Sequence, residues 1–449
     1  MKFASPQILI DLVKRHKQGA PVGIPSICSA NRLVLEAAMH LAAEYGEPLL
    51  IEATCNQVNQ FGGYTGKTPI DFANYVCEIA DRINFSQEHI LLGGDHLGPF
   101  PWQDLDSDQA MENAVSLVRA FVQAGFGKIH IDTSMRCADD DPELPLSLAV
   151  CAQRAARMCR TVEDACALDS ALLQPVYVIG SEVPVPGGTQ EKEATLCATD
   201  PADAARTLAA FRAAFEREGL QTAWKRVIAL VVQPGVEFGD EDLFTYNREK
   251  ARRLSQYIET VPGMIYEAHS TDYQQPEHLR QMVEDHFAIL KVGPGLTFAM
   301  REAVFALAHM EAELLNACEV VTLSEIIETL ETAMLRNPKY WQKYYPQETS
   351  TAAYARKYSL SDRIRYYWTD PEVEAALNHL LENLEAHPVP LTLLSQYMPG
   401  EHAYIRNSGV IKKPRELIWA HIDAVLAGYW SASRGSGLMS DRYGSLLMS

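Results

Sequence analysis

Short apolar runs rich in β-branched residues recur along the first two thirds of the chain, separated by polar or helix-forming stretches. Runs of this length, bounded by Gly, Pro, Asn or Asp, are typical of buried β-strands. The pattern predicts eight strands, at residues 22–28, 48–54, 89–95, 128–134, 175–181, 226–232, 263–269 and 287–293.

The segments between these runs show helical spacing. In AMENAVSLVRAFVQAG, the side chains of Val115, Val118 and Val122 fall on one face of a helix. Strand and helix alternate throughout, and eight such units over roughly 300 residues predict an α/β fold of the TIM (β/α)8 barrel type. A doubly wound sheet usually has fewer strands and a glycine-rich loop after the first one, whereas CSANRLV follows here.

The pattern changes after the eighth strand. LSEIIETLETAML and PEVEAALNHLLENLEA predict helices, and no further clear strand pattern follows. We therefore expect a barrel over residues 1–320 and a helical C-terminal extension packed on it over 321–435. The last residues, 436–449, are small and polar, bury little, and predict a frayed tail.

Composition narrows the functional classes. The net charge of −19 repels phosphate backbones and anionic lipids, so binding to nucleic acid or to a membrane surface is not expected. No apolar run reaches the roughly 18 residues of a transmembrane helix. The N-terminal stretch carries charges at positions 11, 14 and 15, which favours an amphipathic helix over a secretory signal. Nine scattered cysteines without a CxxC pair are typical of reduced thiols in the cytoplasm.

The stretch FGGYTGKT, residues 61–68, resembles a phosphate-binding P-loop but lacks its first glycine. That motif requires glycine five positions before Gly66, and the residue there is Phe61. We interpret the stretch as a flexible loop over the barrel mouth. Lys67 and backbone N–H groups would contact a sugar or phosphate there.

Barrel enzymes carry their active sites at the carboxyl ends of the strands, so polar residues there are the functional candidates. We expect His96, Glu182 and His269 to bind a divalent metal, because mixed His and carboxylate ligands are typical of catalytic sites. Zinc is expected first, with nickel and manganese as alternatives. The candidates for proton transfer are Asp95, Asp132 and Asp272.

The candidate substrate-binding residues share a place at strand ends or in segments expected to reach the mouth: Asn56, Gln57, Lys67, Ser134, Gln233, Lys291, Arg363 and Arg365. Either arginine suits a phosphate, although ion-paired surface or interface residues are the more common case. Glu52 and Lys291 are equally suited to a buried ion pair. His130 lies between isoleucines within a strand, which favours a structural role.

Several long motifs resemble one known family. IEATCNQVNQFGGYTGKTP, GGDHLGPFPWQ, GFGKIHIDTSM, YVIGSEVPVPGG, VVQPGVEFGD, YEAHSTDYQ, DHFAILKVGPGLTFAMREAVFAL and YSLSDRIRYYW are similar to the GatZ/KbaZ family, the so-called non-catalytic subunits of class II tagatose-1,6-bisphosphate aldolase. The likeness runs from about residue 10 to about residue 430. It implies a TIM barrel, a catalytic aldolase partner (GatY/KbaY) and a role in stabilising that partner.

The resemblance also implies roles for individual residues. In class II aldolases the third strand ends in an acid/base aspartate and a zinc-binding histidine, which match Asp95 and His96. A second histidine ligand matches His269. The sixth strand departs from the aldolases, because Gln233 stands where they place a third histidine. Glu182 would supply the missing ligand.

Three functions stay open at this point. The chain resembles a subunit of tagatose-1,6-bisphosphate aldolase in galactitol, tagatose or N-acetylgalactosamine catabolism, acting in an oligomer with its catalytic partner. Some relatives are metal-dependent 4-epimerases that interconvert fructose and tagatose, so a free-standing epimerase is the alternative. Tagatose-6-phosphate kinase is a third and weaker hypothesis, because the P-loop is incomplete. The expected ligand is a ketohexose or its phosphate.

Overall fold

In the computed structural model, eight parallel strands close into a barrel. The structure describes residues 2–141, 143–144, 146–181, 196–316, 318, 320–345, 349–410 and 412–434. The barrel order is β1-β10-β9-β6-β5-β4-β3-β2, and neighbouring strands pair in parallel. Its strands are β1 (Ile24–Ile27), β2 (Leu49–Thr54), β3 (Ile90–Leu97), β4 (Lys128–Asp132), β5 (Val176–Gly180), β6 (Val227–Val231), β9 (Ile265–Ala268) and β10 (Phe287–Val292).

Each strand coincides with one of the predicted runs, so the TIM barrel prediction is confirmed. The helices around it and beyond it are α1 (Gln7–Lys17), α2 (Arg32–Tyr45), α3 (Pro69–Arg82), α4 (Ser107–Gln123), α5 (Leu148–Leu168), α6 (Pro201–Arg217), α7 (Gln221–Trp224), α8 (Arg248–Glu259), α9 (Pro276–Glu284), α10 (Pro294–Leu315), α11 (Ile326–Arg336), α12 (Thr349–Tyr358), α13 (Pro371–Ala386), α14 (Leu391–Tyr397), α15 (Pro399–Ser408) and α16 (Pro414–Ser433). A two-stranded hairpin, β7 (Glu237–Phe238) with β8 (Leu243–Phe244), was not predicted.

Polar side chains set where the barrel helices begin. Asn31 caps α2, Asp106 caps α4 and Asp200 caps α6, and each accepts a hydrogen bond from a backbone N–H of the first turn. Thr68 and Asp71 form a capping box at the start of α3. The threonine of the GKT sequence therefore starts a helix.

The barrel interior is apolar at one end and charged at the other. At the N-terminal end, Leu9 and Val13 of α1 pack with inward-facing residues such as Leu50 and Val178. Two residues further along β2 the inward side chain is Glu52, which is fully buried. This change along the strands leaves the carboxyl ends as the polar end of the barrel.

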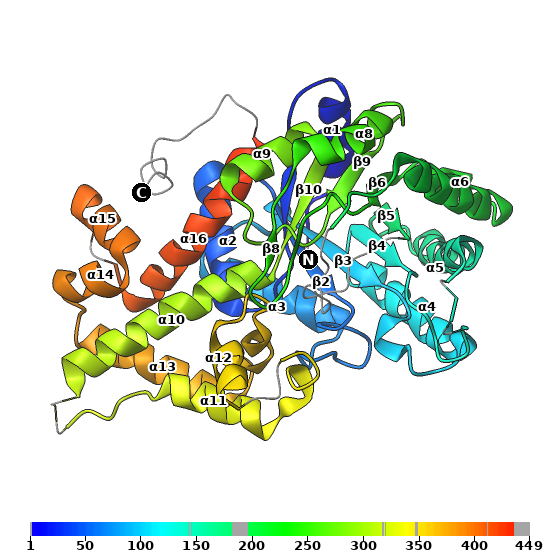
Figure 1. Ribbon diagram of the computed structural model, residues 1–449. Helices are drawn as coiled ribbons and strands as arrows, with labels where there is room; N and C mark the ends of the chain where they lie inside the picture. The colour runs from blue at the N-terminus through cyan, green and yellow to red at the C-terminus, as the bar shows by residue number, and fades with distance from the viewer. Residues whose placement is uncertain are drawn as a thin grey trace.

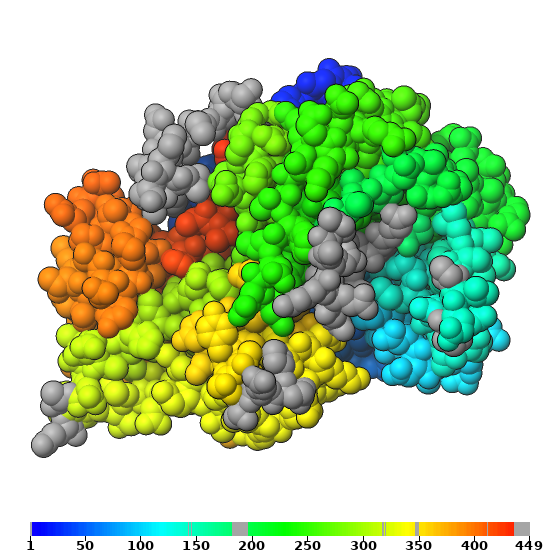
Figure 2. Space-filling view, in the orientation of Figure 1, coloured from blue at the N-terminus to red at the C-terminus, as the bar shows by residue number. Residues whose placement is uncertain are grey.

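The helices after β10 form a lobe beside the barrel, and the last helix returns to it. Figure 2 shows the yellow and orange surface of the C-terminal helices as a lobe beside the green and cyan barrel. Helix α16 packs against α2, α9 and α10 (Figure 1). Ser433 at its end accepts a hydrogen bond of 2.8 Å from the Gly23 N–H. The predicted boundary at residue 320 stays a prediction, and the predicted tail, 436–449, lies outside the described residues.

None of the helices described combines the length and the apolar character required to cross a lipid bilayer.

Candidate functional site

The polar end of the barrel opens into a cleft, whose open space, including the solvent at its mouth, is about 980 Å³. Eight residues predicted from the sequence line it: Asn56, Gln57, Asp95, His96, His269, Asp272, Lys291 and Arg365. Aromatic side chains, including Tyr64, Phe238 and Tyr366, complete the wall. Most of the polar residues predicted from the sequence therefore lie together at the carboxyl ends of the strands.

A buried charge network forms the floor of the cleft. Lys128 Nζ lies 2.7 Å from a carboxylate oxygen of Glu52 and 2.7 Å from one of Glu267. Lys291 Nζ lies 2.8 Å from Glu52 and 2.7 Å from Asp95. The expected Glu52–Lys291 pair is thus present, within a larger network whose members fix one another's positions.

The network has more negative than positive groups. The region holds four carboxylates, of Glu52, Asp95, Asp132 and Glu267, and two lysines, Lys128 and Lys291, and all six side chains are buried. Asp132 pairs with His96 rather than with a lysine. With the imidazoles neutral, two negative charges remain uncompensated. A buried charge excess is costly unless a cation offsets it, and a divalent ion has the matching charge.

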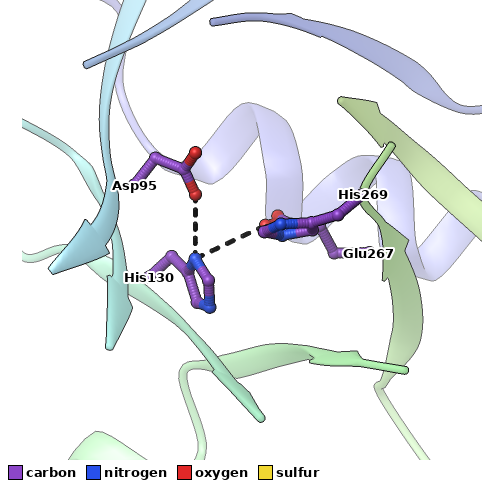
Figure 3. Close-up of side chains that lie close together, drawn as sticks. All are labelled: Asp95, His130, Glu267 and His269. Atoms are coloured by element: carbon purple, nitrogen blue, oxygen red, sulfur yellow. Dashed lines mark hydrogen bonds and ion pairs between the residues drawn. The ribbon is translucent and has the colours of Figure 1, made fainter. Parts of the chain in front are cut away.

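Four side chains of this region form a group suited to hold a metal ion. One ligand atom from each of Asp95, His130, Glu267 and His269 lies within 4.8 Å of the others (Figure 3). His130 Nδ1 is 2.9 Å from Asp95 Oδ1, and His269 Nε2 is 3.0 Å from Glu267 Oε1. His130 was expected to be structural, and its place in this group was missed.

The imidazole of His96 faces that of His269. His96 Nδ1 lies 2.8 Å from Asp132 Oδ2, and since an ionised carboxylate only accepts, Nδ1 carries the hydrogen and Nε2 has a free lone pair. By the same argument Glu267 leaves the lone pair of His269 Nδ1 free. The two free nitrogens are 3.2 Å apart. Two lone pairs that face each other need a proton or a metal ion between them, and carboxylate–histidine pairs of this kind typically orient metal ligands.

The titration of these groups follows from burial and charge. Burial lowers the pKa of His269 to about 3, so the ring is neutral, as a metal ligand must be. Burial also opposes charge on His96, but Asp95 and Asp132 raise its pKa above the ordinary value. Without a metal ion these carboxylates therefore favour a second proton on His96, at Nε2, and a bound metal ion would replace that proton. Burial alone would raise the pKa of Asp132, yet the hydrogen bond from His96 outweighs it and lowers the pKa to about 2.

The backbone is strained next to both histidines. His96 has φ of +50° and Ser270, which follows His269, has φ of +53°. A residue with a side chain seldom adopts this left-handed conformation, and such strain clusters at functional sites. The local fold therefore holds both rings at the mouth at an energetic cost.

Asp272 lies at the wall of the cleft beside the N-terminus of α10. Its Oδ1 accepts hydrogen bonds of 2.9 Å from the Gly293 N–H and 2.7 Å from the Gly295 N–H. Burial raises the pKa of Asp272 to about 6, and these two hydrogen bonds oppose the rise. The carboxylate is buried, titratable and in reach of a bound ligand, as a proton-transfer group requires.

The glycine loop forms part of the cleft wall, but Lys67 does not line it. Tyr64 and Thr65 line the cleft, while Lys67 Nζ lies 4.7 Å from the ring centroid of Tyr75. Asn59 Oδ1 accepts from the N–H groups of Phe61 and Gly63, at 2.9 and 3.1 Å, and so ties the loop.

Other predicted residues lie away from the cleft. The Ser134 hydroxyl donates a hydrogen bond of 2.6 Å to Asp132, the carboxylate that binds His96, and so does not reach the cleft itself. The side chain of Gln233 accepts from the N–H groups of Gly235 and Val236, which turns it into its own loop. Arg363 packs over the ring of Tyr344. Glu182, the predicted third ligand, lies outside the described residues.

Arg365 reaches the cleft from the C-terminal lobe. It belongs to the 3₁₀ helix η4 (Arg363–Tyr367), whose Tyr366 also lines the cleft. Within the described part of the chain, neither Arg363 nor Arg365 has a carboxylate at ion-pair distance, so the alternative of ion-paired residues is not what the structure shows.

Three inward-facing residues, Lys128, His130 and Glu267, were assigned no role in the site from the sequence. Each lies on a strand next to an apolar residue, where a buried structural role is the usual interpretation. A signal was available, because alternate residues of a barrel strand face inward and three charged or ionisable residues on inward positions must meet there.

Comparison with known proteins identifies the family. Residues 9–434 match the family model described as D-tagatose-1,6-bisphosphate aldolase subunit GatZ/KbaZ-like. A solved structure described as a probable tagatose 6 phosphate kinase from Sinorhizobium meliloti 1021 is 48% identical, with a TM-score of 0.83, and the match covers 91% of this chain and 100% of that chain.

Two more distant structures are aldolases. The YdjI aldolase from Escherichia coli K12 is 12% identical with a TM-score of 0.40, covering 86% of this chain and 98% of that one. A fructose-bisphosphate aldolase (Fba) from Campylobacter jejuni is 13% identical with a TM-score of 0.44, covering 86% and 94%. The family match spans nearly the whole chain and confirms the resemblance inferred from the sequence: this chain belongs to the GatZ/KbaZ-like family.

Proposed function

We propose that this protein is a GatZ/KbaZ-type component of class II D-tagatose-1,6-bisphosphate aldolase, which supports the activity and stability of a catalytic GatY/KbaY-type subunit. The observation that carries the proposal is the family match over residues 9–434. The setting is galactitol, tagatose or N-acetylgalactosamine catabolism in the cytoplasm. The assembly is a hetero-oligomer.

The chain also has a metal and sugar site of its own in this proposal. His96 and His269 hold a divalent ion, zinc first with nickel or manganese as alternatives, and Asp132 and Glu267 orient them. Such an ion would polarise a ketose carbonyl and stabilise the negative charge that develops beside it. Asp95, whose Oδ1 lies 2.7 Å from Lys291 Nζ, would exchange a proton with a substrate hydroxyl.

Reconstitution with a catalytic subunit tests the proposal. The rate of D-tagatose-1,6-bisphosphate cleavage and the melting temperature of the catalytic subunit are measured with and without this chain. Both should rise when the chain is added, and a complex should elute as one species in size-exclusion chromatography. Unchanged rate, unchanged melting temperature and separate elution would refute the subunit role.

A second candidate is a free-standing metal-dependent D-tagatose (fructose) 4-epimerase. The buried cluster of histidines and carboxylates at the floor of a ligand-sized cleft favours it, because a chain that only supports a partner needs no such group. In this mechanism Asp95 takes the proton of the C4 hydroxyl, and the C3–C4 bond breaks to give an aldehyde and an enediolate. The enediolate then adds to the other face of the rotated aldehyde, and the proton returns to the C4 oxygen, so that C4 is inverted. Asp132, the other carboxylate considered for this role, is bound to His96 and Ser134 and orients His96 instead. Conversion of D-fructose to D-tagatose by the zinc-loaded chain alone would support it.

The kinase hypothesis has less support. The stretch at 61–68 lacks the P-loop glycine, and Thr68 caps α3 there.

A further inference from the structure

The N-terminus of α10, which follows the eighth barrel strand, is already occupied by a carboxylate. Barrel enzymes frequently bind phosphate near this point, where backbone N–H groups and the helix dipole favour an anion. Here the Gly293 and Gly295 N–H groups donate to Asp272 Oδ1 at 2.9 and 2.7 Å, and Pro294 between them has no N–H to offer. The backbone N–H groups that would bind a phosphate at this helix N-terminus already donate to Asp272.

Asp272 is held in that position by its neighbours. The Thr271 hydroxyl donates to the Lys291 carbonyl at 2.6 Å, and the Tyr429 hydroxyl donates to the Thr271 carbonyl at 2.7 Å. The Asp272 side chain is 3% exposed. Strand β10 and helix α16 therefore fix the backbone beside it, and the carboxylate cannot turn aside without breaking its bonds to the Gly293 and Gly295 N–H groups.

The positive charge of Arg365, which acts on this carboxylate, does not make the wall an anion site. Arg365 donates to the Asp362 carbonyl at 3.0 Å and to the Tyr366 hydroxyl at 2.8 Å. Its positive charge lies close enough to lower the pKa of Asp272, so the two charges offset each other. A donor and an acceptor side by side suit the hydroxyl groups of a sugar.

The rest of this wall also fits a polyol. The rings of Tyr64 and Tyr366 lie 4.8 Å apart and both line the cleft, with Phe238 and Trp368. The indole Nε1–H of Trp368 is buried and has no acceptor among the described residues. Apolar ring surface with a few directed donors and acceptors is the usual composition of small-molecule sites.

The charge of the whole cleft leads to the same conclusion. Five carboxylates, those of Glu52, Asp95, Asp132, Glu267 and Asp272, face three cations, Lys128, Lys291 and Arg365. A divalent ion offsets the difference of two. A phosphate monoester, at about −1.5 to −2 near neutral pH, would restore the excess of negative charge.

We infer that this cleft takes an unphosphorylated ketohexose and that Asp272 is the residue that excludes a phosphate group. The inference rests on the proposed function in that the ligand is a ketohexose, and it goes further in assigning the substrate class. A bisphosphate would then be cleaved on the partner subunit, and this chain's own cleft would hold the free sugar.

Calorimetric titration of the zinc-loaded full chain with D-tagatose and with D-tagatose 6-phosphate tests the inference. The wild-type chain should bind the free sugar at least about tenfold more tightly, because like charges placed together disfavour the phosphate. Asp272→Ser opens the α10 donors, and the preference should fall at least about tenfold. Asp272→Asn keeps an oxygen that can accept the two N–H bonds, so it serves as a second variant in case Asp272→Ser does not fold. Its preference for D-tagatose over D-tagatose 6-phosphate should also fall.

Asp139→Asn, an exposed carboxylate at another loop, is the matched control and should leave the preference unchanged. Equal or tighter binding of the 6-phosphate by the wild type, binding of neither ligand, or an unchanged preference in both Asp272 variants would overturn the inference.

The aldolase assay with the catalytic subunit is read separately. Loss of stimulation with the sugar preference intact would refute the proposed subunit role alone. Stimulation with tighter binding of the 6-phosphate would refute the present inference alone.

Discussion

Lys128 is the residue on which the charge network at the floor of the cleft depends. It is fully buried, and its ammonium group bridges Glu52 and Glu267, 2.7 Å from each. Glu267 in turn orients His269. Buried ion pairs contribute little net stability compared with apolar residues, but removal of one partner leaves the other charge buried and unpaired.

Lys128→Met tests this dependence. The variant keeps most of the side-chain volume and removes the charge, so it should lower the free energy of unfolding by about 3–5 kcal/mol. Urea denaturation measures the change. Lys225→Met, at an exposed site, should change stability by less than about 0.5 kcal/mol. If both substitutions lowered the free energy of unfolding by the same small amount, the charge network would not depend on Lys128 as described.

Site residues could be predicted from the sequence where they lie at the carboxyl ends of strands. The prediction failed where the direction of a side chain decides whether the residue reaches the cleft. Asp95, His96, His269 and Lys291 follow from their positions on the strands. Gln233 also ends a strand, yet its side chain turns into its own loop. The direction of a loop side chain depends on the backbone of that loop, which spacing in the sequence does not determine.

The elements of the barrel were easier to predict than its loops. The eight strands are mostly apolar runs because parallel barrel strands are covered on both faces. The β7–β8 hairpin has only two residues in each strand and no such run. The loop between β2 and α3 has its own constraints, since Gly63 has φ of +56° and lies against the Gln57 carbonyl.

Gly63→Ala and Gly66→Ala form a matched pair in that loop. Both residues are left-handed, so alanine at either costs about 1–2 kcal/mol of stability. At Gly63 the new Cβ would stand 2.4 Å from the Gln57 oxygen, whereas at Gly66 it meets nothing within 4 Å. Gly63→Ala should therefore lose more stability and weaken D-tagatose binding, which Gln57 and Tyr64 shape. Equal losses in urea denaturation and calorimetry would contradict this account of the loop.

Helix α16 is linked to α15 and α10 by ion pairs that depend on pH. His421 Nδ1 is 2.8 Å from Glu401 of α15, and Nε2 is 3.4 Å from Glu302 of α10. Burial alone would lower the pKa of His421, but hydrogen bonds to the two carboxylates raise it to about 9. A raised folded-state pKa stabilises the fold fully below the unfolded pKa, and the contribution is lost as pH rises through the folded value.

The difference in unfolding free energy between wild type and His421→Gln should therefore be largest below about pH 6.5 and should vanish above about pH 9. Chemical denaturation at several pH values measures it. A difference that grows with rising pH would contradict the assignment of these ion pairs.

At the scale of the whole molecule, the chain closes a barrel around a charged centre and covers its mouth from the C-terminal lobe. The net charge of −19 and the excess of buried carboxylates both favour a bound cation over an anionic ligand. The lobe delivers Arg365 and Tyr366 to the cleft, and α16 returns to the barrel (Figure 1). The boundary between the barrel and the helical extension could be predicted only coarsely from the sequence. The residue pattern of α16 does not indicate whether that helix packs on the barrel or on the other C-terminal helices.

The central claim is that the barrel mouth holds one divalent metal ion between His96 and His269. The most direct measurement is the zinc content of the full chain after loading and dialysis, by plasma mass spectrometry, for wild type, His269→Ala and the exposed control His89→Ala. The account predicts about one zinc ion per chain in wild type and control, and almost none in His269→Ala. A wild-type chain without zinc, or a His269→Ala chain that retains it, would contradict the account.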